Sequence, residues 1–307
     1  MNRRKISLKL STLLIIVFFS TLICSAIAHE VTKYKYFPKP ENFPLPNGVL
    51  LDPITFDLTS LIDTNNLDKS NIPEMLDLEA EILISYENLN KGLIYVKITK
   101  IPAELVRICV FPIQYDIVPE FVRLYKDGYY PLNYGSNDYT LKIFLKGTDD
   151  LFYEAYKMDF EAEFETNEPY KYSNVYSDYT HTSVLAAKAY ELTYNLSTTE
   201  EKANKIANYL SNNITYDSLH GVKEEVPDVD LYFERRRGVC YHYSALFSSM
   251  MKSIGIPTKE VRGYGTTSSD YHSWNEYLSE DSNWITIDCT PKANKNDEYT
   301  KEDHSDR

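Results

Sequence analysis

The sequence has few cysteines, and none of them is spaced as in a metal site. Four cysteines occur in 307 residues, with no CxxC pair and no Cys/His spacing typical of zinc, so we expect no metal and no cofactor. If a leader containing Cys24 is cleaved, three remain, Cys109, Cys240 and Cys289. An odd number leaves at least one thiol without an internal disulfide, which excludes a disulfide-based scaffold.

The chain has fewer basic than acidic residues. The chain holds 32 basic and 45 acidic residues, for a net charge of −13. A surface of this sign repels nucleic acid and anionic lipid headgroups. We therefore expect no nucleic acid as a partner, and no attraction to a charged lipid surface.

One long apolar run is present, and it lies at the start of the chain. Four basic residues fall within the first nine positions, no charge follows from Leu10 to Ala28, and residues 26–28 are small enough for a cleavage site. We interpret residues 1–28 as a signal peptide and expect a secreted or cell-surface protein. An uncleaved anchor stays open, because the run is nearly long enough to span a bilayer; it would be the chain's only link to a membrane.

The next two segments differ in pattern. Residues 29–75 carry repeated prolines without a long period, which indicates a spacer. Residues 76–168 show period-two alternation, as in Tyr139 to Lys146, with glycine and proline at the breaks. Several short strands at this spacing predict an all-β, immunoglobulin-like sandwich.

Residues 172–292 combine helical and strand patterns, so the fold class predicted for the chain is α+β. A helix is expected from about Asp178, a second after the capping box of Thr198 and Glu201, and a third, amphipathic one from Cys240 toward Ile254. Strands follow at Lys259 to Tyr264, Tyr271 to Leu278 and Asn283 to Cys289. The polar residues 293–307 indicate a disordered tail.

Cys240 is the first residue with a pattern suited to catalysis. It opens a helix, where free amides favour a thiolate, and Arg235 to Arg237 precede it. Gly238 allows close backbone approach beside it. A single helix cysteine is more commonly a small core residue, so Cys240 alone does not decide the function.

A predicted hairpin supplies two further groups. Pairing the last two strands around residue 280 sets His272 opposite Asp288, on one face of the sheet. An imidazole that takes the thiol proton makes sulfur a good nucleophile, and a carboxylate orients the imidazole. Each residue also has a simpler interpretation, as a satisfied strand histidine and as a strand-end carboxylate.

The oxyanion of a tetrahedral intermediate needs hydrogen-bond donors. The backbone N–H of Cys240 is one candidate. Tyr216 and Asn275 are weaker candidates for a second.

Five segments in order resemble the transglutaminase-like superfamily. They are Asn213–Asp217, Arg237–Leu246, Gly255–Tyr264, His272–Glu276 and Trp284–Asp288. The resemblance covers roughly residues 178–292 and implies a papain-like core with Cys240, His272 and Asp288 as its catalytic triad. The β-rich region before it resembles the sandwich that precedes this domain in some exported bacterial members.

The chain departs from the family pattern after Asp288. Many members have proline directly after this aspartate, where this chain has Cys289. The second thiol could be inert, pair with Cys109, or resolve an oxidised Cys240. Farther upstream in the sequence, Asp228 is interpreted as a helix cap rather than a calcium ligand.

The function implied is that of a thiol acyltransferase or amidohydrolase, which forms a thioester from a peptide or protein amide. Cell-wall peptide is one substrate that fits. The sequence leaves open whether water or an amine accepts the acyl group. It also leaves open a cysteine peptidase on the same triad, and a non-catalytic surface adhesion module on this fold.

Overall fold

The computed structural model describes residues 54–56, 80–99, 101–115, 123–147, 151–180, 182–217, 228–265, 271–291 and 299–301. All of them belong to one compact unit, Asn42–Arg307. The predicted signal peptide lies outside the described residues. None of the described helices has the length and apolar content needed to cross a bilayer.

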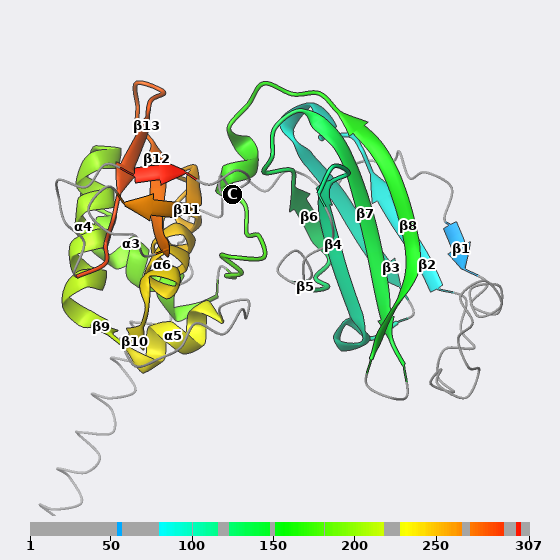
Figure 1. Ribbon diagram of the computed structural model, residues 1–307, viewed down its shortest axis with the longest axis horizontal. Helices are drawn as coiled ribbons and strands as arrows, with labels where there is room; N and C mark the ends of the chain where they lie inside the picture. Colours follow the sequence, from blue (N-terminus) through cyan, green and yellow to red (C-terminus); the bar gives the residue numbers. More distant parts are fainter. Residues whose placement is uncertain are drawn as a thin grey trace, which may run out of the picture. The chain divides into compact units, whose positions relative to one another are not determined.

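The described strands of the first part of the unit form two four-stranded antiparallel sheets (Figure 1). One has the order β1-β2-β3-β6, from β1 (Ile54–Phe56), β2 (Ala80–Ser85), β3 (Leu93–Thr99) and β6 (Gly128–Pro131). The other has the order β5-β4-β7-β8, from β5 (Arg123–Leu124), β4 (Val106–Pro112), β7 (Asn137–Lys146) and β8 (Phe152–Ala162). Short 3-10 helices lie at Leu89–Lys91, Ala103–Leu105 and Glu168–Lys171.

Both sheets contribute to one apolar core. Ile84 and Val96 of one sheet share a cluster with Ile108 and Ile143 of the other. The period-two prediction is therefore confirmed as paired strands around a common core, while the immunoglobulin-like topology stays a prediction. Strand β1 lies inside the range predicted to be a spacer, so that range is not wholly without structure.

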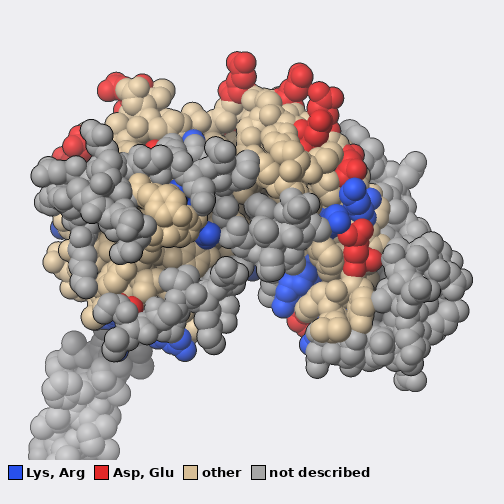
Figure 2. Space-filling model, in the orientation of Figure 1, with Lys and Arg blue, Asp and Glu red and all other residues tan. Residues whose placement is uncertain are grey.

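Strand β8 is at the edge of its sheet, and acidic side chains gather over its end (Figure 2). Asp159 and Glu161 are exposed there, and Glu163 follows the strand. Charge on an edge strand discourages pairing with a second chain.

In its described residues, the second part has four helices and a sheet of order β13-β12-β11-β14 (Figure 1). The helices are α3 (Val184–Thr193), α4 (Thr199–Asn213), α5 (Val229–Arg235) and α6 (Cys240–Ser253). The strands are β11 (Thr258–Gly265), β12 (Tyr271–Leu278), β13 (Trp284–Ile287) and β14 (Tyr299–Lys301), with a separate parallel pair of β9 (Thr215–Tyr216) and β10 (Arg237–Gly238). The prediction of a disordered tail is wrong at residues 299–301, because β14 pairs with β11.

The predicted helix signals have mixed outcomes. Thr198 Oγ1 accepts from the backbone N–H of Glu201, whose carboxylate accepts from that of Thr198, so the capping box is confirmed. Asp228 caps α5 through the N–H of Leu231, at 2.9 Å. Helix α3 begins six residues later than Asp178.

Helix α6 is central rather than amphipathic. All its residues from His242 to Ser253 are buried, and it packs against α3, α4, α5, β11 and β12. Lys252 is fully buried, donating to Ser177 Oγ at 2.7 Å and lying 3.5 Å from Glu260 Oε2 on β11. Burial lowers the pKa of Lys252. The apolar face that the sequence predicted is thus only one of the faces of α6 that are buried.

Removing one member of this buried pair is expected to destabilise the protein. Glu260→Leu should lower the free energy of unfolding by about 3 kcal/mol, because Lys252 is left buried without its counter-charge. The double variant Lys252→Met/Glu260→Leu should recover most of that loss. Urea denaturation measures both, and a double variant as unstable as the single one would contradict this role for the pair.

Candidate active site

The position of Cys240 is set by the segment just before α6. Strand β10 pairs with β9, and the N–H of Asp217 donates to the carbonyl of Gly238 at 2.9 Å. Val239 is the extended N-cap of α6, and its carbonyl accepts from the N–H groups of His242 and Tyr243. Cys240 is therefore the first helical residue, as predicted, where backbone amides point out of the helix without intrahelical partners.

His242 fixes this turn from inside the helix. Its Nδ1 accepts from the backbone N–H of Val239 at 3.1 Å, and its ring lies 3.7 Å from that of Tyr232. A Cβ on Gly238 would come within 2.7 Å of the His242 Cβ. The glycine two residues before the cysteine is thus required by the capping histidine, whose Nδ1 is used within its own turn.

The hairpin between β12 and β13 has a different register from the predicted one. Leu278 pairs with Trp284 and Glu276 with Thr286, a shift of two residues. The loop runs from Glu280 to Ser282, and the N–H of Ser279 donates a hydrogen bond to the carbonyl of Asn283 across its base. Ser282 takes a left-handed conformation (φ 61°), which removes it from the strand. A shift of two keeps each side chain on its face, so His272 and Asp288 become diagonal rather than opposite neighbours.

The two groups nevertheless meet. His272 Nε2 lies 2.5 Å from Asp288 Oδ2. Cys240 is among the groups that raise the pKa of His272, so its side chain lies beside the ring. Because Asp288 occupies Nε2, the nitrogen available to the thiol is Nδ1. The structure thus brings Cys240, His272 and Asp288 together from a helix start, a strand and a strand end.

The electrostatics of the pair favour charge on both groups. Burial alone would lower the pKa of His272, but the hydrogen bond to Asp288 and the influence of Cys240 outweigh it and raise that pKa to about 10. Burial alone would raise the pKa of Asp288, but the hydrogen bonds from His272 and Thr290 hold it below its ordinary value. The site therefore holds an imidazolium against a carboxylate.

The sequence analysis did not identify two residues that hold His272 and Asp288 in place. The Trp274 ring is stacked with that of His272, with centroids 6.4 Å apart, and is almost wholly buried. The N–H of Thr290 donates to Asp288 Oδ1 at 2.8 Å. An aspartate that accepts from the backbone two residues on is a common turn pattern, so Asp288-Cys289-Thr290 held a signal for the second support.

The two oxyanion candidates have different positions. Both amide hydrogens of Asn275 are used, by the carbonyls of Ser244 and Lys259, and its place on β12 alternates with that of His272. We do not retain Asn275 as a candidate. Tyr216 is half-buried and pairs in register with Gly238, so it lies beside the backbone that leads to Cys240.

The basic residues before Cys240 are exposed, and Arg237 forms an ion pair with Asp217 at 2.8 Å. They add no direct contact to the thiol in the interactions described.

The two other cysteines among the described residues, Cys109 and Cys289, are free and buried. Burial raises the pKa of Cys109 to about 12 and that of Cys289 well above its ordinary value. Cys289 contacts the carbonyl of Tyr243 within the helical core, and Cys109 belongs to a sheet cluster with Phe111. The two do not pair with each other in this structure.

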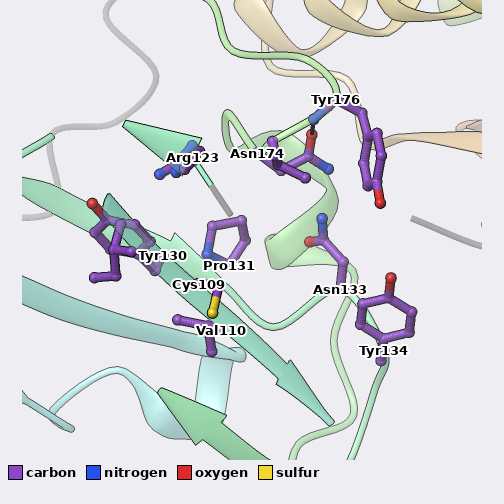
Figure 3. A pocket seen from close by; sticks show the side chains of 11 residues that line it. Cys109, Val110, Arg123, Tyr130, Pro131, Asn133, Tyr134, Asn174 and Tyr176 are labelled. Atoms are coloured by element: carbon purple, nitrogen blue, oxygen red, sulfur yellow. Dashed lines mark hydrogen bonds between the residues drawn. The ribbon is translucent and has the colours of Figure 1, made fainter. Parts of the chain in front are cut away.

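A small cavity is lined by residues of β4, β5 and β6 and of the segments 133–134 and 174–176 (Figure 3). Its volume of about 50 Å³ suits a few water molecules, and its lining includes Cys109, Arg123, Asn133 and Asn174 but none of the three site residues. Among the described residues, no group of three His, Cys, Asp or Glu side chains could hold a metal ion.

Comparison with known families agrees with this geometry. Residues 186–289 match the model of the transglutaminase-like superfamily. This part of the chain is a transglutaminase-like domain. The match includes Cys240, His272 and Asp288, and its fold is the mixed helix and strand arrangement described above.

Similar proteins share this domain over part of their length. "Uncharacterized protein YebA" of Bacillus subtilis is 26% identical over 126 residues, which cover 34% of this chain and 17% of that protein. "Protein-glutamine gamma-glutamyltransferase" of Pseudomonas aeruginosa is 29% identical over 73 residues, which cover 20% and 11%. The chain thus spans less than a fifth of either relative.

Among solved structures, the periplasmic domain of TgpA from Pseudomonas aeruginosa bound to ethylmercury aligns with a TM-score of 0.35 at 14% identity, over 61% of this chain and 90% of that one. Red sea bream transglutaminase aligns with a TM-score of 0.30 at 12% identity, over 80% of this chain and 54% of that one.

The raised pKa of His272 predicts a pH-dependent stability. A group whose pKa is higher in the folded state stabilises the fold fully below its ordinary value of 6.5, and this contribution is lost as pH rises toward 10. The difference in the free energy of unfolding between wild type and His272→Gln should therefore shrink steadily from pH 6.5 to 10. Urea denaturation across that range measures it, and a constant or growing difference would contradict the assignment.

Proposed function

We propose that the transglutaminase-like domain is a thiol acyltransferase or amidohydrolase, with Cys240 as nucleophile, His272 as acid and base, and Asp288 as the residue that orients His272. One observation carries the proposal. Asp288 is hydrogen-bonded to the His272 ring, and Cys240, at the start of a helix, acts on the same ring and raises its pKa. A cysteine that only fills the core needs no such partners, so the interpretation of Cys240 as a small core residue does not explain these contacts.

The contacts suit a two-step reaction. His272 holds the proton of Cys240, so the sulfur attacks the carbonyl carbon of an amide as a thiolate, and the tetrahedral intermediate collapses as its C–N bond breaks. The imidazolium of His272 gives its proton to the leaving amine, and a thioester remains on the sulfur. Neutral His272 then takes a proton from the acceptor, which attacks the thioester and releases the thiolate, so that the starting pair of imidazolium and thiolate is restored.

Asp288 keeps His272 in the required state. The carboxylate on Nε2 orients the ring with Nδ1 toward the sulfur and stabilises the imidazolium. The backbone N–H of Cys240 lies at the positive end of α6 and is suited to donate to the oxyanion. Tyr216, beside Gly238, is our candidate for the second donor.

The substrate class that we propose is a peptide or protein amide, with cell-wall peptide as one that fits. The name of the Pseudomonas relative, a protein-glutamine gamma-glutamyltransferase, supports an amide donor. Water as acceptor gives hydrolysis, an amine gives cross-linking, and a backbone amide as donor gives a peptidase on the same triad. A non-catalytic adhesion module on this fold is the alternative without chemistry.

We place this chemistry at the cell surface or beyond it. The support is the basic start and the uncharged run from Leu10 to Ala28.

The nucleophile is tested by labelling with a glutamine peptide and a biotinylated amine. Wild type should incorporate the amine or hydrolyse the peptide, and Cys240→Ala should lose at least a hundredfold of either activity. Cys289→Ala removes a buried thiol from the same core and serves as the matched control, with activity retained. Equal activity in wild type and Cys240→Ala would exclude Cys240, and the absence of any activity or thioester in wild type would favour the adhesion module.

Export is tested by the mass of the protein recovered from its native cells. Cleavage after Ala28 should remove 28 residues and with them the four basic residues of the start. A mature N-terminus at Met1 in the membrane fraction would indicate the uncleaved anchor instead, and the intact chain in the cytoplasm would contradict export.

A further inference from the structure

Arg262 contacts the residue that follows the proposed nucleophile, although it is distant from it in the sequence. It sits on β11 directly opposite Ser273 of β12, and the following pair in the register is Gly263 with His272. Side chains alternate along a strand, so Arg262 and Ser273 lie on one face of the sheet and His272 lies on the other. The guanidinium carbon of Arg262 lies 4.6 Å from the ring centroid of Tyr241, the residue after Cys240. Arg262 is therefore adjacent to the start of α6, where the proposed nucleophile lies.

The guanidinium is held in a defined position. A second ring, that of the buried Tyr176, lies 5.0 Å from the same carbon. Contacts with two aromatic rings restrict the long side chain, so less conformational entropy is lost when it binds a further group. The side chain is only partly buried, and part of it reaches the surface.

The same face of the sheet continues into two exposed aromatic rings. Side chains alternate along β11, so Arg262 and Tyr264 share a face, and Tyr264 pairs with Tyr271 across the strands. The rings of Tyr264 and Tyr271 make an edge contact at 5.5 Å, yet 45% and 48% of these residues remain exposed. A partly exposed cation and an exposed apolar surface thus lie side by side near the thiol.

We propose that Arg262 binds a carboxylate of the acyl donor, on the residue that carries the reacting amide or on its neighbour, while Tyr264 and Tyr271 contact the adjoining part of the peptide. This rests on the proposed function of Cys240. Arg262 is then a specificity residue, which selects donors with a free acid beside the amide over donors with a second amide there.

A carboxylate fits better than a polyanion. The planar guanidinium can form two parallel hydrogen bonds with a carboxylate, and the cluster of Arg262, Tyr241 and Tyr176 contains one cation. The net charge of −13 opposes the approach of a long polyanion. A local contact with a short acidic peptide is compatible with both facts.

A purely structural role is the competing interpretation, in which Arg262 joins Tyr176 to Tyr241 and touches no substrate. The two roles differ in one respect. A structural role changes reactions with all donors alike, whereas a specificity role changes the ratio between an acidic and a neutral donor.

The experiment uses two peptide probes that need only the thiol to react. In each, a chloromethyl ketone replaces the side-chain amide of glutamine, so sulfur displaces chloride and forms a C–S bond. One probe ends in a free α-carboxylate and the other in an α-carboxamide. The full-length protein is treated with each, and the rate of labelling at Cys240 is followed by mass spectrometry.

The measured quantity is the ratio of the labelling rates of Cys240 with the acidic and the neutral probe. Wild type should react about ten times faster with the acidic probe, since a hydrogen bond to a charged group is lost in the neutral one. Arg262→Gln should bring the ratio to about 1, and Arg262→Lys should retain only part of it, because an ammonium lacks the planar fork. Arg237→Gln removes an exposed charge near Cys240 in sequence and should leave the ratio unchanged.

Two results would overturn the inference while leaving the proposed function intact. One is fast labelling of Cys240 in wild type with a ratio near 1. The other is an unchanged ratio in Arg262→Gln and Arg262→Lys, whatever their thermal stability. If instead neither probe labels Cys240 faster than free cysteine, the proposed function itself fails, and the inference fails with it.

Discussion

The hydrogen bond between His272 and Asp288 is the interaction on which the rest of the site depends. It uses Nε2, so it decides which ring nitrogen faces the thiol, and it outweighs the burial that would otherwise disfavour an imidazolium. Without the carboxylate, a half-buried histidine beside a thiol would have little reason to stay charged. The reactive cluster is therefore a property of the pair, more than of the cysteine alone.

Much of the surrounding structure serves to keep that pair beside the helix start. The β9–β10 pair and the His242 cap hold the segment that leads into α6, and Gly238 is the residue that lets them approach. Stacking by Trp274 and the N–H of Thr290 fix the other two members. The burial of α6 on all sides gives the cysteine a rigid base, which suits precise alignment of a nucleophile.

The sequence predicted those parts that depend on local signals. The start of α6 and the bounds of β12 were predicted correctly, because a glycine precedes the helix and alternation marks the strand. The hairpin register was wrong by two residues, since nothing in the sequence shows that Ser282 adopts a left-handed conformation. A shift of two residues leaves each side chain on the predicted face of the sheet, so the proximity of His272 and Asp288 was still predicted.

Contacts between distant segments could not be predicted in this way. Lys252 on a helix would ordinarily be assigned to solvent, yet it is buried against Glu260. The arrangement of Arg262 between Tyr176 and Tyr241 likewise joins three separate segments.

The most direct test of the account is the protonation of His272 itself, followed by NMR of a protein labelled in the imidazole nitrogens. The account predicts that His272 stays protonated until pH approaches about 10 in wild type, and that Asp288→Asn lowers its titration toward the ordinary value of 6.5. Titration of His272 near 6.5 in the wild-type protein, unchanged by Asp288→Asn, would contradict it.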